Sequence, residues 1–218
     1  LTQDVPKVPA SWADSEVDEA PRAQPGLGRS LFAWSNAKFV GREADRDTLW
    51  RALKTARDDQ KLSIVGIFGQ PGMGKSALAK WLVEKAHATG VAQPFQMFHE
   101  LPNGPRCGLH GMVRRALRVV GLSQHDTEAA LAALCERESL SSSARALGDL
   151  LAANESSQNT HRVTVQERFA AVANLLAVAC IRRTVILLVD DLQWGDEALE
   201  FLSYLRADWS TLPLLVVT

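Results

Sequence analysis

The chain has 218 residues, of which 46% are hydrophobic and 22% are charged, and its formal net charge is −1. This composition is typical of a folded domain with one sizeable core, and it excludes nucleic-acid binding that is driven by overall positive charge. No apolar run is long enough for a transmembrane helix. The three scattered cysteines lack the spacing of a disulfide framework or a zinc site and favour a reducing cytoplasm.

Residues 1–30 are predicted to be a disordered linker. Four of the nine prolines and an acidic cluster over residues 14–19 fall in this stretch. Such a segment buries too little apolar surface to offset its chain entropy. The early charges and prolines also exclude a secretory signal. Because the chain starts without Met, we expect it to be a piece of a longer protein, with the folded domain over residues 31–218.

Helical and strand patterns alternate along the folded part, which predicts a doubly wound α/β domain with a parallel sheet. The run over 62–68 is apolar at nearly every position, which favours a strand that is covered on both faces. Strands are predicted over residues 62–68, 94–101, 185–190 and 212–218. Helices are predicted over residues 42–57, 76–89, 108–120, 127–137, 143–153, 164–181 and 196–204. Their inward faces include Leu49, Trp50, Leu53, Leu78, Leu82, Ala86, Phe169, Val172, Leu176 and Cys180.

The segment GQPGMGKS, residues 69–76, has the spacing G-x-x-x-x-G-K-S between a predicted strand and a predicted helix. Its glycines let backbone N–H groups point at phosphate oxygens, and the helix presents its positive dipole end to the same anion. Lys75 is the expected charge on the β- and γ-phosphates, and Ser76 the expected Mg²⁺ ligand. A glycine-rich turn that matches by chance is the alternative. The predicted nucleotide contacts are Gly69, Gln70, Pro71, Gly72, Met73, Gly74, Lys75, Ser76 and Ala77.

A second motif, VILLVDD over residues 185–191, places two carboxylates at the C-terminal end of a parallel strand. Ligand chemistry in α/β sheets is found at this edge. We expect Asp190 to hold Mg²⁺ opposite Ser76, directly or through water, and Asp191 to orient or polarise an attacking water. The alternative for Asp191 is that it only begins a turn.

The motifs FVGRE (Phe39–Glu43), GQPGMGKS and LLVDDLQWGDEALEFL (Leu187–Leu202) together resemble the ATPase module of the STAND class of P-loop NTPases. These are AAA-related signalling ATPases of large bacterial regulators, and the resemblance spans about residues 35–218. It implies a three-layer α/β sheet of the ASCE/AAA type, in which the strand carrying Thr218 inserts between the phosphate-loop strand and the strand ending at Asp190. It also implies that Val40 and Gly41 contact adenine. The alternative for Val40 is a core residue that anchors the first helix.

Two features depart from the pattern of this class. The chain ends at LLVVT, where the class continues into a sensor residue, a further strand and a helical lid, so we expect the domain to be incomplete at its C-terminus. Residues 104–159 look like a helical insertion without a nameable motif. Within it, Arg114, Arg115 and Arg118 indicate a solvated basic helix face rather than a contact with nucleic acid. The five histidines show no metal-ligand spacing and are interpreted as surface or core residues.

The resemblance implies a Mg²⁺-dependent ATPase that converts ATP to ADP and phosphate slowly and acts as a regulatory switch. Its expected partners are ATP or ADP and covalently attached signalling and effector domains, with nucleotide-dependent self-association and without a membrane or a direct nucleic-acid contact. An ATP-binding scaffold with negligible turnover is the alternative. A GTPase is disfavoured because the second motif reads DDLQ rather than D-x-x-G and no N-K-x-D occurs. No substrate lid of a small-molecule kinase is recognisable.

Overall fold

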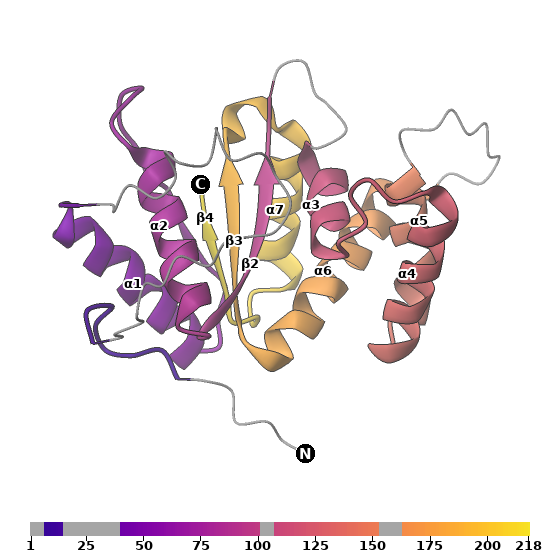
Figure 1. Ribbon diagram of the computed structural model, residues 1–218, viewed down its shortest axis with the longest axis horizontal. Helices are drawn as coiled ribbons and strands as arrows, with labels where there is room; N and C mark the ends of the chain where they lie inside the picture. The colour runs from indigo at the N-terminus through magenta and orange to yellow at the C-terminus, as the bar shows by residue number, and fades with distance from the viewer. Residues whose placement is uncertain (1–6, 15–39, 101–106, 153–162) are drawn as a thin grey trace.

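A computed structural model describes residues 7–14, 40–100, 107–152 and 163–218, and it shows a three-layer α/β domain with a central parallel sheet (Figure 1). The sheet order is β1-β4-β3-β2, and each neighbouring pair is parallel. Strand β4 therefore lies between β1 and β3, as the resemblance predicted. The strands are β1 (Ser63–Val65), β2 (Ala92–Phe98), β3 (Thr184–Asp190) and β4 (Leu214–Val217).

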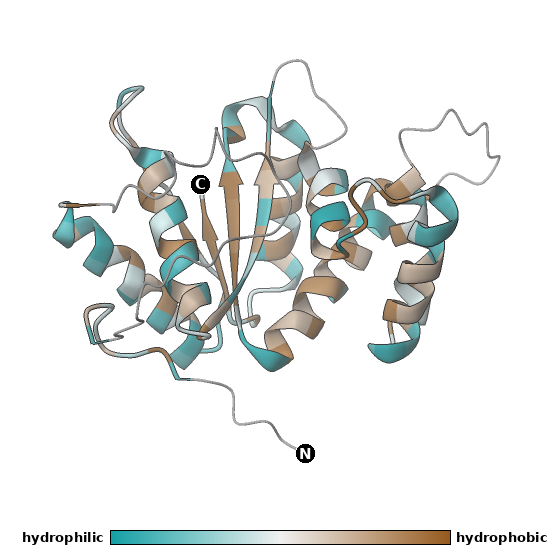
Figure 2. Cartoon of the chain, in the orientation of Figure 1, coloured by the Kyte–Doolittle hydropathy of each residue, from teal (hydrophilic) through white to brown (hydrophobic). Residues whose placement is uncertain are grey.

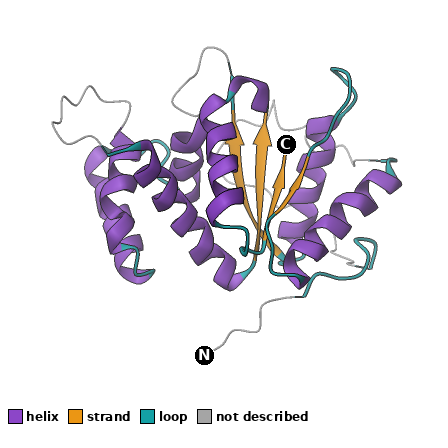
Figure 3. Ribbon diagram, turned by 180° about the vertical axis from the view of Figure 1, so that it is seen from behind, coloured by secondary structure: helices purple, strands orange, loops and turns teal. Residues whose placement is uncertain are grey.

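Helices cover both faces of this sheet (Figures 1 and 3). On one face lie α1 (Glu43–Asp58) and α2 (Lys75–Ala88). On the other lie α3 (Gly108–Ala116), α6 (Val165–Arg182) and α7 (Asp196–Asp208), the last preceded by the 3₁₀ turn η2 (Leu192–Trp194). The remaining elements, α4 (Gln124–Arg137), η1 (Ser141–Ser143) and α5 (Ala144–Ala152), pack outside this layer. No helix of the described ranges is both long and apolar enough to cross a bilayer.

The core consists of two apolar clusters, one on each face of the sheet. Along β3, Val185, Leu187 and Val189 face the α6 side, whereas Ile186 and Leu188 face the α1–α2 side. A strand that is buried on both faces reads as a continuous apolar run, and Figure 2 shows the central strands as the apolar centre of the domain. The predicted inward faces of α1, α2 and α6 are all buried, which confirms the helical periodicity.

Strand β1 is shorter and less covered than its sequence predicts. Only Ser63–Val65 form the strand, and among the described residues it pairs with β4 alone. Val65 and Ile67 pack on the α1–α2 side, but the Ile64 side chain points to the other face and is 44% exposed. The prediction of cover on both faces is wrong because the helices of the α6 layer are centred on β2 and β3 rather than on this edge.

Residues 7–14 pack against the domain, so the prediction of disorder over residues 1–30 is wrong for this part. Val8 is only 4% exposed and belongs to the core cluster of α1 and α2. Trp12 packs against the same cluster. The apolar and aromatic residues between the prolines supply buried surface that orders these eight residues against α1 and α2. The rest of the predicted linker lies outside the described residues.

The helical insertion packs on the apolar cluster of the α6 side, and arginine hydrogen bonds join it to neighbouring segments. Helix α3 ends at Ala116, earlier than predicted, because Arg118 adopts a left-handed backbone conformation (φ 59°). Arg114 donates to the carbonyls of Leu151 and Val119, and Arg115 to that of Gln96, so the predicted solvated basic face is wrong for these two residues.

Helix α6 begins with a capping box of Thr164 and Glu167, in which each side chain accepts from the other residue's backbone N–H.

Candidate functional site

The predicted phosphate loop and the predicted acidic pair lie at the same edge of the sheet, where the parallel strands end. The loop Gly69–Ser76 follows β1 and leads into α2, and Asp190 is the last residue of β3. Strand β4 separates the two strands, yet the loop and Asp190 meet across it. This is the edge at which open α/β sheets bind ligands.

Glycines give the loop its backbone path. Gly72 (φ 81°) and Gly74 (φ 76°) have left-handed conformations, which residues with a Cβ adopt only at a cost. Space is not the reason, since a Cβ at either position would meet nothing within 4 Å. Gly74 is also the N-cap of α2, and no side chain caps this helix end. The first N–H groups of α2 are therefore available to an anion, together with the positive end of the helix dipole.

Lys75, the first residue of α2, folds back onto the loop. Its Nζ donates to the carbonyl of Gly69 at 2.9 Å and to that of Gln70 at 3.1 Å. These contacts hold the ammonium group against the loop that leads into the uncapped start of α2. The loop itself is open to solvent, and the exposed residues of the predicted site are Gly69, Gln70, Pro71, Gly72, Met73, Ser76 and Ala77.

Ser76 and Asp190 come together although 114 positions separate them in the chain. The Ser76 hydroxyl donates to Asp190 Oδ1 at 3.1 Å. A hydroxyl and a carboxylate oxygen are hard ligands of the kind that Mg²⁺ prefers, and Mg²⁺ commonly takes only one or two protein ligands beside water and phosphate. The pair therefore fits the ion. No group of three or more acidic, His or Cys side chains suited to a metal occurs in the described ranges.

Asp191 lies next to this pair with its side chain in solvent. Its backbone is left-handed (φ 56°, ψ 42°), and it is the N-cap of η2. Gln193 Nε2 donates to its Oδ1 at 2.9 Å. The structure thus gives Asp191 a role in the turn, and among the described residues no donor contacts its other carboxylate oxygen, Oδ2.

His99 is a residue of the site that the sequence analysis did not single out. It follows β2, and in the parallel register Phe98 of β2 is opposite Asp190. The buried ring lies with Nδ1 3.2 Å from the Asp190 carbonyl oxygen, and its Nε2 has no hydrogen-bond partner among the described residues. A Cβ on Gly195 would approach the ring to 2.4 Å. Its position was the available signal, because a polar residue directly after a strand of a parallel sheet lies at the edge where such sheets bind ligands.

The FVGRE segment contacts the phosphate loop through its arginine. Arg42 Nη1 donates to the Met73 carbonyl at 3.1 Å, and its Nε pairs with Asp45 at 2.7 Å. Val40 is 83% exposed, which contradicts the alternative that it is a core anchor. Gly41 (φ 80°) has open space around its Cα. Phe39 lies outside the described residues.

Comparison with known proteins agrees with this geometry. A family model described as an AAA ATPase domain matches residues 38–217, which include the phosphate loop, Asp190, Asp191 and all four strands. No curated protein matches the chain. AAA ATPase domains bind nucleotide and usually use Mg²⁺, in accord with the uncapped α2 and the Ser76–Asp190 pair. Because the match covers most of its length, the chain belongs to the AAA ATPase domain family.

Proposed function

We propose that the chain is an ATP-binding and slowly ATP-hydrolysing module of the STAND type, which acts as a regulatory switch within a larger cytoplasmic signalling protein. The observation that carries the proposal is the contact of Ser76 with Asp190 beside the uncapped start of α2. This contact places two oxygen ligands suited to Mg²⁺ next to the backbone N–H groups that would bind phosphate. The attached signalling and effector domains, and self-association that depends on nucleotide, belong to the same proposal.

In this proposal the backbone N–H groups of the loop and of the first turn of α2 hold the β- and γ-phosphates. Lys75 exchanges its contacts with the Gly69 and Gln70 carbonyls for phosphate oxygens. Ser76 and Asp190 hold Mg²⁺, which when bound neutralises charge on those oxygens. Val40 and Gly41 border the adenine, which suits the high exposure of Val40.

Hydrolysis in this proposal adds one water to the γ-phosphorus and breaks its bond to the β–γ bridging oxygen, which leaves with ADP. The proton that the water loses passes to the released phosphate and from there to solvent. Asp191 orients that water, which donates a hydrogen bond to Asp191 Oδ2, the carboxylate oxygen that Gln193 does not contact. The alternative function is an ATP-binding scaffold with negligible turnover. The hydrogen bond from Gln193 to Asp191 Oδ1 is compatible with it, because it gives the carboxylate a structural role in the turn. Turnover measurements separate the two functions.

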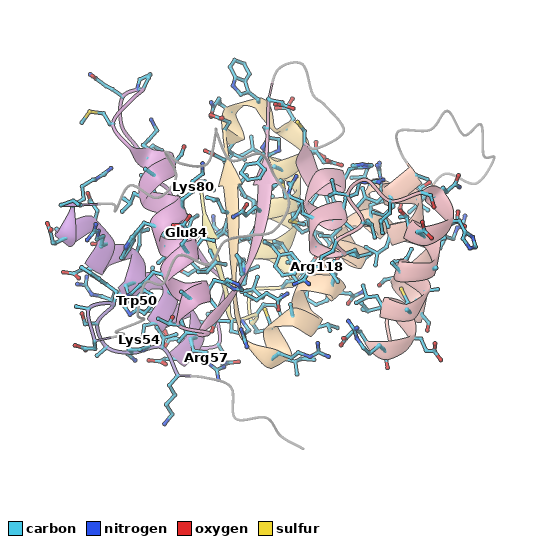
Figure 4. All side chains as sticks on the ribbon, viewed as in Figure 1. Trp50, Lys54, Arg57, Lys80, Glu84 and Arg118 are labelled. Atoms are coloured by element: carbon cyan, nitrogen blue, oxygen red, sulfur yellow. The ribbon has the colours of Figure 1, made fainter. Side chains whose placement is uncertain are left out.

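A thermal melt with and without Mg-ATP tests the nucleotide site. Ligand at about 100 times its Kd adds roughly 2.7 kcal/mol, which raises the Tm of a domain of this size by about 5–10 °C. Lys75→Ala should abolish this shift. Lys80→Ala is the matched control, because Lys80 is exposed on the same helix and its charge acts on Glu84, one turn further from the loop (Figure 4). A wild-type Tm that Mg-ATP does not change, or an equal shift in Lys75→Ala, would contradict the proposal.

A further inference from the structure

Residues 7–14 lie against the helices that carry the nucleotide site, although they precede the matched residues 38–217. Val8 is buried in the apolar cluster to which α1 and α2 both contribute. The indole Nε1 of Trp50 donates to the Pro9 carbonyl at 2.9 Å. Trp50 is a residue of α1, and it belongs to the same apolar cluster as the buried residues of α2. The segment therefore bridges two helices rather than extending one of them. We call residues 7–14 the clasp.

Trp12 is the residue through which the clasp makes most of its contacts. Its Nε1 donates to Asp47 Oδ1 of α1 at 2.7 Å. Its ring meets the ring of Trp81 of α2 edge to face, with centroids 5.4 Å apart and an interplanar angle of 88°. The guanidinium carbon of Arg46 lies 5.1 Å from the Trp12 ring and 5.0 Å from the Trp81 ring. One cation is thus enclosed by an indole from the clasp and an indole from α2.

Both helices lead directly from these contacts to the phosphate loop. Arg46 donates its backbone N–H to the Arg42 carbonyl at 2.9 Å, one turn away, and the Arg42 side chain donates to the Met73 carbonyl at 3.1 Å. Trp81 lies on α2, which begins with Lys75 and Ser76. A shift of α1 against α2 changes the distance from Arg42 to the loop, because a packed helix moves as a unit.

We propose that the clasp is a conformational device that couples the chain preceding the ATPase domain to its nucleotide affinity. This inference rests on the proposed function, since it assigns regulation to the same site. When the clasp is docked, it holds α1 and α2 together, and Arg42 keeps its hydrogen bond to the Met73 carbonyl of the phosphate loop. When the clasp dissociates from α1 and α2, the hydrogen bond from Arg42 to the loop weakens and nucleotide binds more weakly. Linkage requires the reverse as well: bound nucleotide tightens the docking of the clasp.

The clasp is suited to reversible docking. It contains no helix or strand, and its described contacts are one buried valine, two indole hydrogen bonds and the Trp12 packing. Short segments with few buried contacts open at a lower free energy than core elements do. A pull or a competing partner on the preceding chain can therefore release the clasp without unfolding the domain.

Binding of a fluorescent ATP analogue with Mg²⁺ to the full chain tests the coupling. Trp12→Ala and Asp47→Ala should each raise the Kd about fivefold or more, the lower end of common coupling factors. Asp47→Asn keeps an oxygen acceptor for the indole and should restore much of the affinity. Trp209→Ala is the matched control, because Trp209 also donates from its indole, to Tyr204, but belongs to the cluster on the opposite face. The Kd of the Trp209→Ala variant for the ATP analogue should equal that of the wild type.

Hydrogen exchange of the unmodified chain gives a second readout that needs no variant. Mg-ATP should slow exchange in a peptide that contains residues 7–14 and leave the α4 peptide, residues 124–137, unchanged. Wild-type Kd values in both clasp variants, or exchange of residues 7–14 that ignores nucleotide, would overturn the clasp and leave the nucleotide function intact. A wild-type chain that binds no nucleotide would overturn both proposals.

Discussion

Gly195→Ala is predicted to destabilise the domain through a steric conflict with His99. The φ of Gly195 is −123°, so an alanine meets no backbone strain there. The added Cβ would instead lie 2.4, 2.6 and 2.8 Å from three atoms of the His99 ring. That ring is buried, and its Nδ1 is in contact with the Asp190 carbonyl, so it has little room to move away.

The size of the effect follows from this overpacking. Inserting a methyl group into a filled site costs about 1–3 kcal/mol, and about 2 kcal/mol corresponds to a Tm lower by roughly 4–8 °C in a chain of this length. Because His99 contacts the Asp190 carbonyl, displacement of the ring should also weaken the stabilisation by Mg-ATP.

Two other glycines are matched controls for this substitution. Gly66→Ala also produces a close approach, 2.7 Å to the Phe68 ring, but that ring is 92% exposed and can rotate away, so a small loss is expected. Gly148→Ala places its Cβ 3.6 Å from Leu131 inside α5 and should stabilise by about 0.5–1 kcal/mol, because alanine favours a helix interior.

Denaturant unfolding of the three variants and of Gly195→Ala/His99→Ala checks the reasoning. Removing the ring should make the double variant less destabilised than the sum of the single changes. A neutral Gly195→Ala, or a double variant whose loss is simply additive, would refute the conflict with His99.

Three further outcomes are expected. Asp191→Asn should lower ATP turnover and leave Mg-ATP binding nearly unchanged; equal turnover in a phosphate-release assay would remove Asp191 from the mechanism. The Arg137 and Arg182 guanidinium groups hold the pKa of the 7% exposed Glu138 carboxyl below its usual range. Glu138→Ala should therefore cost about 1–2 kcal/mol above about pH 5, and this difference should close as the pH falls through the lowered pKa; a loss that is independent of pH in acid unfolding curves would contradict the ion pair. Burial raises the pKa of the Cys180 thiol to about 12, so a thiol reagent at pH 8 should label Cys180 only after unfolding, and stoichiometric labelling of the native chain would show that the site opens.

Much of the fold could be predicted from local patterns. The apolar periodicity located α1, α2 and α6 to within one or two residues, because one buried stripe per helix is a property of the local sequence. The apolar run before Asp190 located β3 for a similar reason. The order of strands came from the resemblance alone, since no local pattern tells which strands are neighbours.

Cover over the edge strand and the docking of residues 7–14 could not be predicted in this way. The run over 62–68 resembles a central strand, yet Ile64 is exposed because exposure at an edge depends on which helices lie opposite. The clasp contains one proline and two charged residues, and its order depends on Trp81 and Asp47, which are far away in the chain. A segment of this kind folds only against a surface that other residues build.

The candidate site divides along the same line. The sequence by itself determined the residue types for phosphate and Mg²⁺ chemistry, because glycines, a lysine, a serine and an aspartate at those spacings follow from what backbone N–H groups and oxygen ligands can do. Only the tertiary structure decided that Ser76 lies 3.1 Å from Asp190, that Arg42 supports the loop at Met73, and that His99 fills the space above Gly195. These contacts join residues from different strands and helices. Their distances depend on sheet register and helix packing, which bring together residues that are far apart in the chain. The spacing of residues within a motif therefore does not predict these distances.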